Sequence, residues 1–305
     1  MISDGPFIHR LYNPNCYKKY KSFIVYYAAY FTVVACDNNK IIAGNLNPCK
    51  AVIVIKTDTM LATIKNYLQR RISAPAVTEK SVVEAYDLWS ADYDKQPDNL
   101  MLYLDARLFS LLISQINITG KHIADIGCGT GRHWPTLLSK QPADLTGFDV
   151  SGGMLSKLNE KYPEAHTNLI TDNLFSDIPD ESYDVIISTL TVAHIEDIEE
   201  AIQAWSRLLK SDGEIIITDF HPHTLAFGGK RTFKHNNAVL AVHNYVHPIY
   251  TIKEVLLKNN FSLLSQEEIK IDESMKPFYT KQNALHVYEK YKGFPVIYGI
   301  HLKKG

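Results

Sequence analysis

Hydrophobic and polar positions change their period several times along the chain, and these changes separate predicted strands from predicted helices. From about residue 120 onward, short apolar runs alternate with segments whose apolar residues recur every three or four positions. Such alternation predicts a mostly parallel sheet with helices on its faces. The predicted strands of this sheet are 121–126, 143–150, 168–172, 183–190, 214–220, 261–271 and 295–302.

The first 75 residues follow a different pattern. Runs rich in Val, Ile, Tyr and Phe at 22–36, 41–44 and 51–56 are separated by turn signals, which favours a small antiparallel meander. A helix is predicted over 60–71, and an Ala-Pro-Ala linker follows it. We therefore predict a small α+β extension, rich in strands, over 1–75. The sequence leaves its role open between a substrate lid, a dimerisation element and a structural appendage.

Two further segments surround the predicted sheet. Residues 80–118 carry apolar residues at helical spacing and predict a helical lead-in to the domain. An insertion from about 221 to 250 precedes the helix that follows the fifth strand. Within the insertion, the runs 230–233 and 238–245 flank a turn, which predicts a β-hairpin.

Composition and charge exclude several classes of protein. The chain has 305 residues, 46% of them hydrophobic, and a formal net charge of −1. It contains no run rich in Lys and Arg, so no nucleic-acid partner is expected. The apolar run 23–36 is shorter than the roughly 18 residues of a membrane span. Four cysteines without C-x-x-C spacing predict reduced thiols in a cytoplasmic protein.

The most informative stretch joins the first strand of the predicted sheet to the helix after it. It contains Asp125 followed by three glycines at alternate positions, Gly127, Gly129 and Gly131. Glycines allow a tight turn and the close approach of a ligand to the backbone. A dinucleotide fingerprint would place a glycine where Arg132 stands. The Asp125 carboxylate would also repel a pyrophosphate, whereas it suits a cationic ligand.

The pattern D-x-G-x-G-x-G resembles motif I of the class I S-adenosylmethionine (SAM)-dependent methyltransferases, and the resemblance covers about residues 80–303. It implies a Rossmann-like, seven-stranded, mostly parallel sheet of order 3-2-1-4-5-7-6 with the last strand antiparallel. It also implies SAM as the cofactor, bound at the carboxyl ends of the strands. Two alternatives remain, namely a SAM-binding protein without transferase activity and a nicotinamide-dependent oxidoreductase.

Acidic residues end the next two predicted strands as well. Asp149 follows Asp125 by roughly 24 residues, close to the separation of about 20 that is typical of a ribose-binding acid. The resemblance implies that Met154 packs on the adenine, that Asp172 accepts a hydrogen bond from its amine, and that Ser188 contacts the methionine part. The predicted cofactor-binding residues are Tyr93, Asp125, Gly127, Cys128, Gly129, Gly131, Asp149, Val150, Met154, Asp172, Asn173, Leu174 and Ser188.

The residues that bind the acceptor are harder to predict from sequence, because methyl transfer needs a base only when the acceptor is protonated. Histidine titrates near neutral pH, and His221 at the end of the fifth strand is our first hypothesis for a base, with His194 as the alternative. We expect His223, Tyr245 and His247 of the insertion to contact the acceptor. The competing interpretation is that these histidines only pin the hairpin.

The acceptor is predicted to be a small molecule. The family segment that binds adenine or glutamine amino groups, N/D-P-P-Y/F, is absent after the fourth strand, where Ser188 begins Ser-Thr-Leu-Thr. No metal is predicted, because the insertion offers imidazoles rather than the carboxylates of a divalent-cation site. No membrane partner is expected, and a homodimer is left open.

Overall fold

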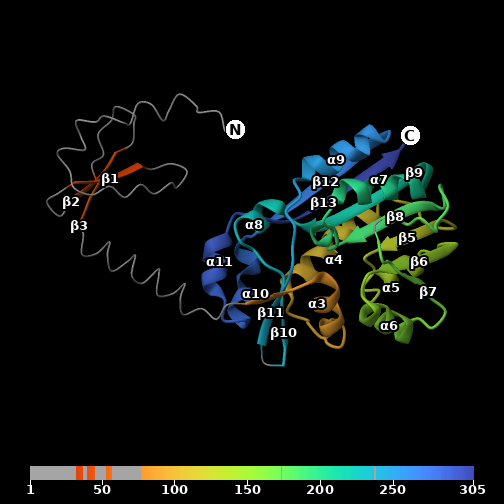
Figure 1. The fold of residues 1–305 in the computed structure, drawn as a ribbon, viewed down its shortest axis with the longest axis horizontal. Coiled ribbons are helices and arrows are strands. Elements are labelled where there is room, and N and C mark those ends of the chain that lie inside the picture. The colour runs from red at the N-terminus through yellow and green to blue at the C-terminus, as the bar shows by residue number, and fades with distance from the viewer. Residues whose placement is uncertain (1–31, 37–39, 45–52, 57–76, 173, 237) are drawn as a thin grey trace. The chain divides into compact units, whose positions relative to one another are not determined.

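The chain divides into two units, Met1–Ala76 and Val77–Gly305, and each is described by itself. Among the described residues, no helix is long and apolar enough to cross a membrane. The predicted helix over 60–71 and its linker lie outside the described residues. The computed structural model (Figure 1) describes residues 32–36, 40–44, 53–56 and 77–305, apart from 173 and 237.

The first unit contains a three-stranded antiparallel sheet. Its strands β1 (Thr32–Cys36), β2 (Lys40–Gly44) and β3 (Ile53–Lys56) pair in the order β1-β2-β3. The pairing is antiparallel at both ladders. The described strands agree with the predicted meander, whose residues 22–31 lie outside the described residues, and the role of the unit stays a prediction.

The second unit is built on one seven-stranded sheet, and the predicted Rossmann-like order is confirmed. All neighbouring strands are parallel except β13, which is antiparallel to both of its neighbours. In spatial order the strands are β12 (Phe261–Lys270), β13 (Pro295–Lys304), β9 (Leu209–Phe220), β8 (Tyr183–Thr189), β5 (His122–Ile126), β6 (Asp144–Asp149) and β7 (His166–Leu169).

Helices cover both faces of this sheet because successive strand residues point to opposite sides. Ile216 of β9 packs with the helices of one face, whereas its neighbours Ile215 and Ile217 pack with those of the other. The first face is covered by α4 (Leu100–Ile113), α5 (Trp134–Leu138) and α6 (Gly152–Lys161). The second face is covered by α7 (Ile198–Leu208) and α9 (Ile249–Lys258).

A small second sheet lies beside the first helix of the unit. Strands β10 (Thr232–His235) and β11 (Ala238–Val242) form the predicted hairpin, and β4 (Thr78–Lys80) adds to β11 in parallel. The hairpin shares a buried apolar cluster with α3 (Val82–Trp89). The insertion is therefore tied to the lead-in segment, although the two lie far apart along the chain.

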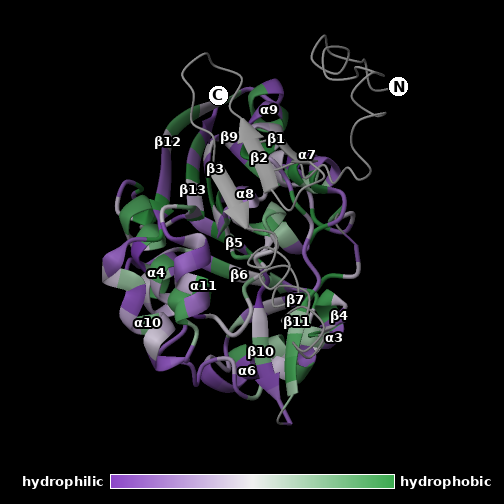
Figure 2. Cartoon of the chain, turned by 90° about the vertical axis from the view of Figure 1, so that its left-hand side faces the viewer, coloured by the Kyte–Doolittle hydropathy of each residue, from purple (hydrophilic) through white to green (hydrophobic). Residues whose placement is uncertain are grey.

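Shorter helices complete the unit. Hydrophilic and hydrophobic residues alternate along α10 (Lys276–Lys281) and α11 (Leu285–Tyr291), as Figure 2 shows, and α10 buries none of its side chains. The short elements are η1 (Val192–His194), α8 (Pro222–Ala226), η2 (Glu273–Met275), α10 (Lys276–Lys281) and α11 (Leu285–Tyr291).

Two strand boundaries differ from the predictions by about three residues or more. The fifth strand was predicted over 214–220, whereas β9 begins at Leu209 and includes the turn residues 211–213, where Asp212 adopts a φ of 63° and the pairing of β8 with β9 shifts register. The turn residues therefore form an irregularity in the strand rather than its boundary. At the other edge, β7 ends at Leu169, and the residues up to Asp172 leave the sheet.

Candidate functional site

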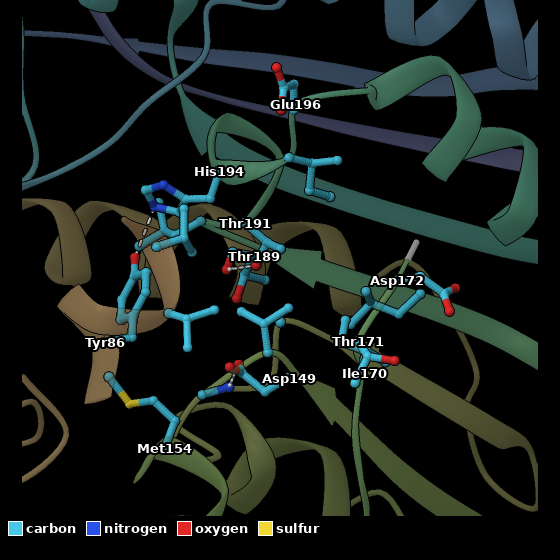
Figure 3. A pocket seen from close by; sticks show the side chains of 18 of the residues that line it. Tyr86, Asp149, Met154, Ile170, Thr171, Asp172, Thr189, Thr191, His194 and Glu196 are labelled. Carbon is cyan, nitrogen blue, oxygen red and sulfur yellow. Dashed lines mark hydrogen bonds between the residues drawn. The ribbon is translucent and has the colours of Figure 1, made fainter. Parts of the chain in front are cut away.

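A cavity of about 480 Å³ lies at the carboxyl ends of β5, β6 and β8 (Figure 3). This is the edge where open α/β sheets bind ligands, and the volume lies within the range of about 300–1,000 Å³ for small-molecule sites. The structure brings eight of the predicted site residues to the lining of this cavity. They are Tyr93, Gly127, Gly129, Asp149, Val150, Met154, Asp172 and His194.

The glycine loop forms the floor of the cavity without side chains. Gly127, Gly129 and Gly131 have φ values of 74°, 54° and 73°, a region that glycine adopts readily. A Cβ on Gly127 would lie 2.0 Å from Oγ1 of Thr191, whereas a Cβ on Gly129 would meet open space. The loop therefore leaves room for a ligand above Gly129 and packs tightly at Gly127.

Asp149 holds this loop from the end of β6. Its Oδ2 accepts a hydrogen bond from the Gly129 backbone N–H at 2.8 Å, and its Oδ1 accepts one from the Ser151 N–H at 2.9 Å. Burial raises the pKa of Asp149 to about 6, so the carboxylate is mainly ionised at pH 7. Asp149 therefore presents a negative charge to the cavity that hydroxyl donors of a ligand can reach.

Tyr86 and Tyr93 form an aromatic wall of the cavity. The Tyr86 hydroxyl lies 2.9 Å from Nε2 of His194, as Figure 3 shows. The other ring nitrogen, Nδ1, lies 3.0 Å from the His243 carbonyl oxygen, so it must be the protonated one. Burial lowers the pKa of His194 to about 3. His194 is therefore neutral, and its remaining lone pair accepts the Tyr86 hydroxyl proton.

Four predicted cofactor-binding residues lie behind the cavity rather than in it. The Asp125 carboxylate accepts a hydrogen bond from Nε1 of Trp134 at 2.9 Å, and burial raises its pKa to about 7. Cys128 is buried, and Ser188 is buried within β8 with no partner for its hydroxyl among the described residues. Gly131 packs on Leu158 and Trp134. These residues shape the floor, and the structure gives them no side-chain contact with the cavity.

The segment after β7 is only partly described. Asn173 lies outside the described residues. The Leu174 side chain is exposed, and its backbone N–H donates to Oδ1 of Asp172 at 2.8 Å. Asp172 reaches the rim of the cavity, whereas Leu174 does not line it.

The structure does not bring His221 to this cavity. Its Nδ1 accepts the His223 backbone N–H at 3.1 Å, and its Nε2 faces Glu268 at 3.7 Å. His221 therefore begins α8, a role that sequence alone cannot separate from catalysis at the same strand end. His223 stacks on Phe294 with the ring centroids 5.0 Å apart, also away from the cavity.

Tyr245 and His247 hold the insertion against the segment after β8. The Tyr245 backbone N–H donates to the Ala193 carbonyl at 2.7 Å, and Nε2 of His247 donates to the Ile195 carbonyl at 2.7 Å. Both side chains line a separate cavity too small for a substrate. For these two residues the geometry favours a structural role, in which they hold the insertion in place, over contact with an acceptor.

Several lining residues were not predicted from the sequence. Tyr86 and Val82 face the cavity from α3, and their i, i+4 spacing was the available signal. Leu190 lines it with a φ of 55°, a conformation that is costly for a branched side chain and is often found at functional sites. Glu196 is brought in by the irregular segment after η1, for which the sequence carries no signal.

Within the part of the chain that the structure describes, no group of three His, Cys, Asp or Glu side chains could hold a metal ion. The histidines of the insertion are instead engaged in separate contacts, such as that of His243 with Glu79. The prediction that no metal takes part is not tested by this observation.

Comparisons with known proteins relate part of this unit to methyltransferases. Residues 124–217 match the family described as "Methyltransferase domain". An uncharacterized methyltransferase of Geobacillus thermodenitrificans is 31% identical over 153 residues, which span 50% of this chain and 66% of the relative. A biotin biosynthesis bifunctional protein, BioHC, of Cellvibrio japonicus is 28% identical over 174 residues, 57% of this chain and 32% of the relative. The chain thus spans 66% of the first relative and 32% of the second.

The fold agrees with this family. An S-adenosylmethionine dependent methyltransferase from Mesorhizobium loti superposes with a TM-score of 0.50 over 64% of this chain and 97% of that one, at 16% identity. Family match and fold together confirm the resemblance of the sequence motifs. The unit Val77–Gly305 has the fold of the SAM-dependent methyltransferases, and its residues 124–217 match a methyltransferase domain, a class whose cofactor is SAM.

Proposed function

We propose that this protein transfers the methyl group of SAM to a small-molecule acceptor. The observation that carries the proposal is the joining of the glycine loop and Asp149 in one cavity of about 480 Å³. The loop offers backbone without side chains at Gly129, and the carboxylate offers an acceptor for ribose hydroxyls. Both features suit a nucleoside, which supports SAM as the ligand.

The residues that would hold SAM divide between the two sides of the cavity. Asp149 would accept from the ribose, Met154 and Phe175 would pack on the adenine, and Asp172 lies at the rim where the adenine amine would donate. When bound, SAM supplies an activated methyl group. The chain's own task is to hold the acceptor in line and to exclude water, for which Tyr86 and Tyr93 form the wall.

The geometry gives neither histidine a clear role as a base. His221 lies outside the lining, where one ring nitrogen accepts from the α8 backbone and the other faces Glu268. His194 lies in the wall, but its free lone pair already accepts the Tyr86 hydroxyl and its pKa is about 3. Catalysis therefore rests on positioning rather than on general-base assistance.

A small acceptor is supported by the modest cavity volume of about 480 Å³ and by the name of the BioHC relative, which refers to the biosynthesis of a small molecule. We retain as predictions a cytoplasmic protein without nucleic-acid or membrane partners, and a possible contribution of Met1–Ala76 to acceptor binding or dimerisation.

Calorimetry with SAM, its demethylated product S-adenosylhomocysteine and NAD tests the cofactor half of the proposal. We expect binding of the first two and none of NAD. Transfer of radioactive methyl from labelled SAM to a small-molecule extract then tests the reaction. Tight binding of NAD would contradict the proposal. Binding of SAM with no transfer to any fraction would favour a SAM-binding protein without transferase activity.

A further inference from the structure

Residues 82–94, called the wall segment below, comprise α3 and the turn after it. Its side chains that line the cavity are those of Val82, Val83, Tyr86 and Tyr93. Trp89 ties the segment to the second sheet, because it stacks on Phe233 with the ring centroids 4.7 Å apart. Two aspartates of the segment, Asp87 and Asp94, lie outside the cavity lining and bond the loops beneath it instead.

Asp87 joins the wall segment to the start of α6. Its Oδ1 accepts hydrogen bonds from the Ser151 hydroxyl at 2.6 Å and from the Gly153 backbone N–H at 2.9 Å. Ser151 is buried, and its own N–H donates to Asp149. A Cβ on Gly153 would lie 2.9 Å from the Ser90 hydroxyl oxygen, so α3 and α6 approach each other closely here. Asp87 is therefore linked through Ser151 to the acid that the proposed function assigns to the ribose.

Asp94 joins the other end of the wall segment to the glycine loop. Its Oδ1 accepts a hydrogen bond from the hydroxyl of the buried Thr130 at 2.7 Å. Thr130 directly follows Gly129, whose N–H donates to Asp149. Oδ2 of Asp94 also lies 3.0 Å from Nζ of Lys161, but exposed ion pairs of this kind contribute little. The bond from Thr130 is therefore the contact that connects Asp94 to the cavity.

The wall segment and Asp149 thus bond the same two loops. Asp149 accepts from the backbone N–H groups of Gly129 and Ser151, whereas the segment accepts from the side chains of Thr130 and Ser151. A cofactor that fills the cavity would contact both the loops and the wall. Its affinity therefore depends on how the wall is placed relative to the loops, because a ligand binds more tightly to a preorganised site.

We propose that Asp87 and Asp94 are positioning residues for cofactor binding, which fix Tyr86 and Tyr93 relative to the glycine loop and Asp149. The inference rests on the proposed function and deepens it. Asp87 acts through Ser151 and Gly153, and Asp94 acts through Thr130. In each aspartate a single oxygen, Oδ1, accepts these bonds, so an Asn side chain can keep them whereas an Ala side chain removes them.

Binding of S-adenosylhomocysteine to the full-length protein tests this inference without an acceptor. Calorimetry should show that its dissociation constant rises by about tenfold in Asp87→Ala and in Asp94→Ala. Asp87→Asn and Asp94→Asn should stay within about threefold of the wild type, because each keeps the accepting oxygen. Asp92→Ala is the matched control and should leave the affinity unchanged. Asp92 is exposed in the same segment, and its carboxylate bonds Lys95 alone among the described residues.

Two further measurements separate positioning from a merely structural role. If Asp87 acts through the Ser151 hydroxyl, the double variant of Asp87→Ala and Ser151→Ala should bind S-adenosylhomocysteine no more weakly than the weaker of the two single variants. Hydrogen exchange of residues 82–94 should slow when the ligand is added to the wild type or to Asp87→Asn, and much less in Asp87→Ala. A merely structural role would lower the melting temperature of Asp87→Ala and leave both readouts as in the wild type.

Unchanged affinity in either folded alanine variant would overturn the role of that aspartate. Equal losses in the Ala and Asn variants would do so too, because the accepting oxygen would then not be what matters. If Asp87→Ala did not fold, Gly153→Ala would test the same contact, since its methyl group separates α3 from α6, and unchanged affinity there would refute Asp87. Failure of the wild type to bind SAM or S-adenosylhomocysteine would instead refute the proposed function itself.

Discussion

Replacement of Asp149 by Asn tests the ribose assignment most directly. The substitution preserves the shape of the side chain but removes its charge and one of its two acceptor oxygens. The carboxylate now accepts from Gly129 and Ser151 at 2.8 and 2.9 Å, and in the variant one of these buried N–H groups would face an amide NH2. Loss of a charge-assisted hydrogen bond costs about 1.5–3 kcal/mol. We therefore expect the dissociation constant for SAM to rise about 10- to 150-fold.

The pH dependence of binding gives this prediction a second signature. Because the pKa of Asp149 is raised to about 6, the carboxylate becomes protonated as the pH falls below that value. Protonation removes an acceptor for the ribose hydroxyls, so wild-type affinity for SAM should decline below about pH 6. The amide introduced by Asp149→Asn cannot titrate, so the variant should lack that component of the decline. Isothermal titration calorimetry between about pH 5 and 8 measures both quantities.

A matched control is available on the same strand. Asp144 stands at the opposite end of β6 and bonds Thr146 and His166, away from the cavity. Asp144→Asn should leave SAM affinity within about twofold of the wild type. If Asp149→Asn did the same and kept its pH dependence, the ribose assignment would be wrong. Asp149 would then serve only to hold the glycine loop.

Three other changes have defined outcomes. Gly127→Ala forces a Cβ to within 2.0 Å of Thr191 and should lower the free energy of unfolding by more than about 2 kcal/mol, whereas Gly129→Ala should cost about 1 kcal/mol; equal losses in urea titrations would contradict this. Asp125 keeps its proton up to about pH 7 in the folded protein but only to about pH 4 in the unfolded chain. The free energy of unfolding of the wild type should therefore fall, relative to that of Asp125→Asn, by up to about 1.4 kcal/mol per pH unit between pH 4 and 7. The same pH dependence of the melting temperature in both proteins would contradict this prediction. A chain of Val77–Gly305 alone should fold and bind SAM, and an insoluble product would show that the first unit completes the core.

Local sequence determined the fold, because each strand and helix carries its own periodicity. The apolar runs of β5, β8 and β9 must be buried on both faces, which requires helices on either side. The glycine loop could also be predicted from the sequence, since the three glycines adopt positive φ values that residues with a Cβ rarely adopt. Asp149 followed from its place at a strand end. These features depend on residues close together in sequence, so periodicity and spacing were enough to find them.

Tertiary contacts decided the roles of the polar residues far apart in sequence. His221 and His194 are both histidines near strand ends, yet only His194 meets Tyr86, 108 residues earlier, in the wall of the cavity. The burial of Arg231 could not be predicted from the sequence, because an arginine before a hairpin is usually exposed. Arg231 becomes buried only when β10 and β11 pack on α3. Burial and charge balance depend on which segments meet in space, and a residue's own neighbours along the chain do not contain that information.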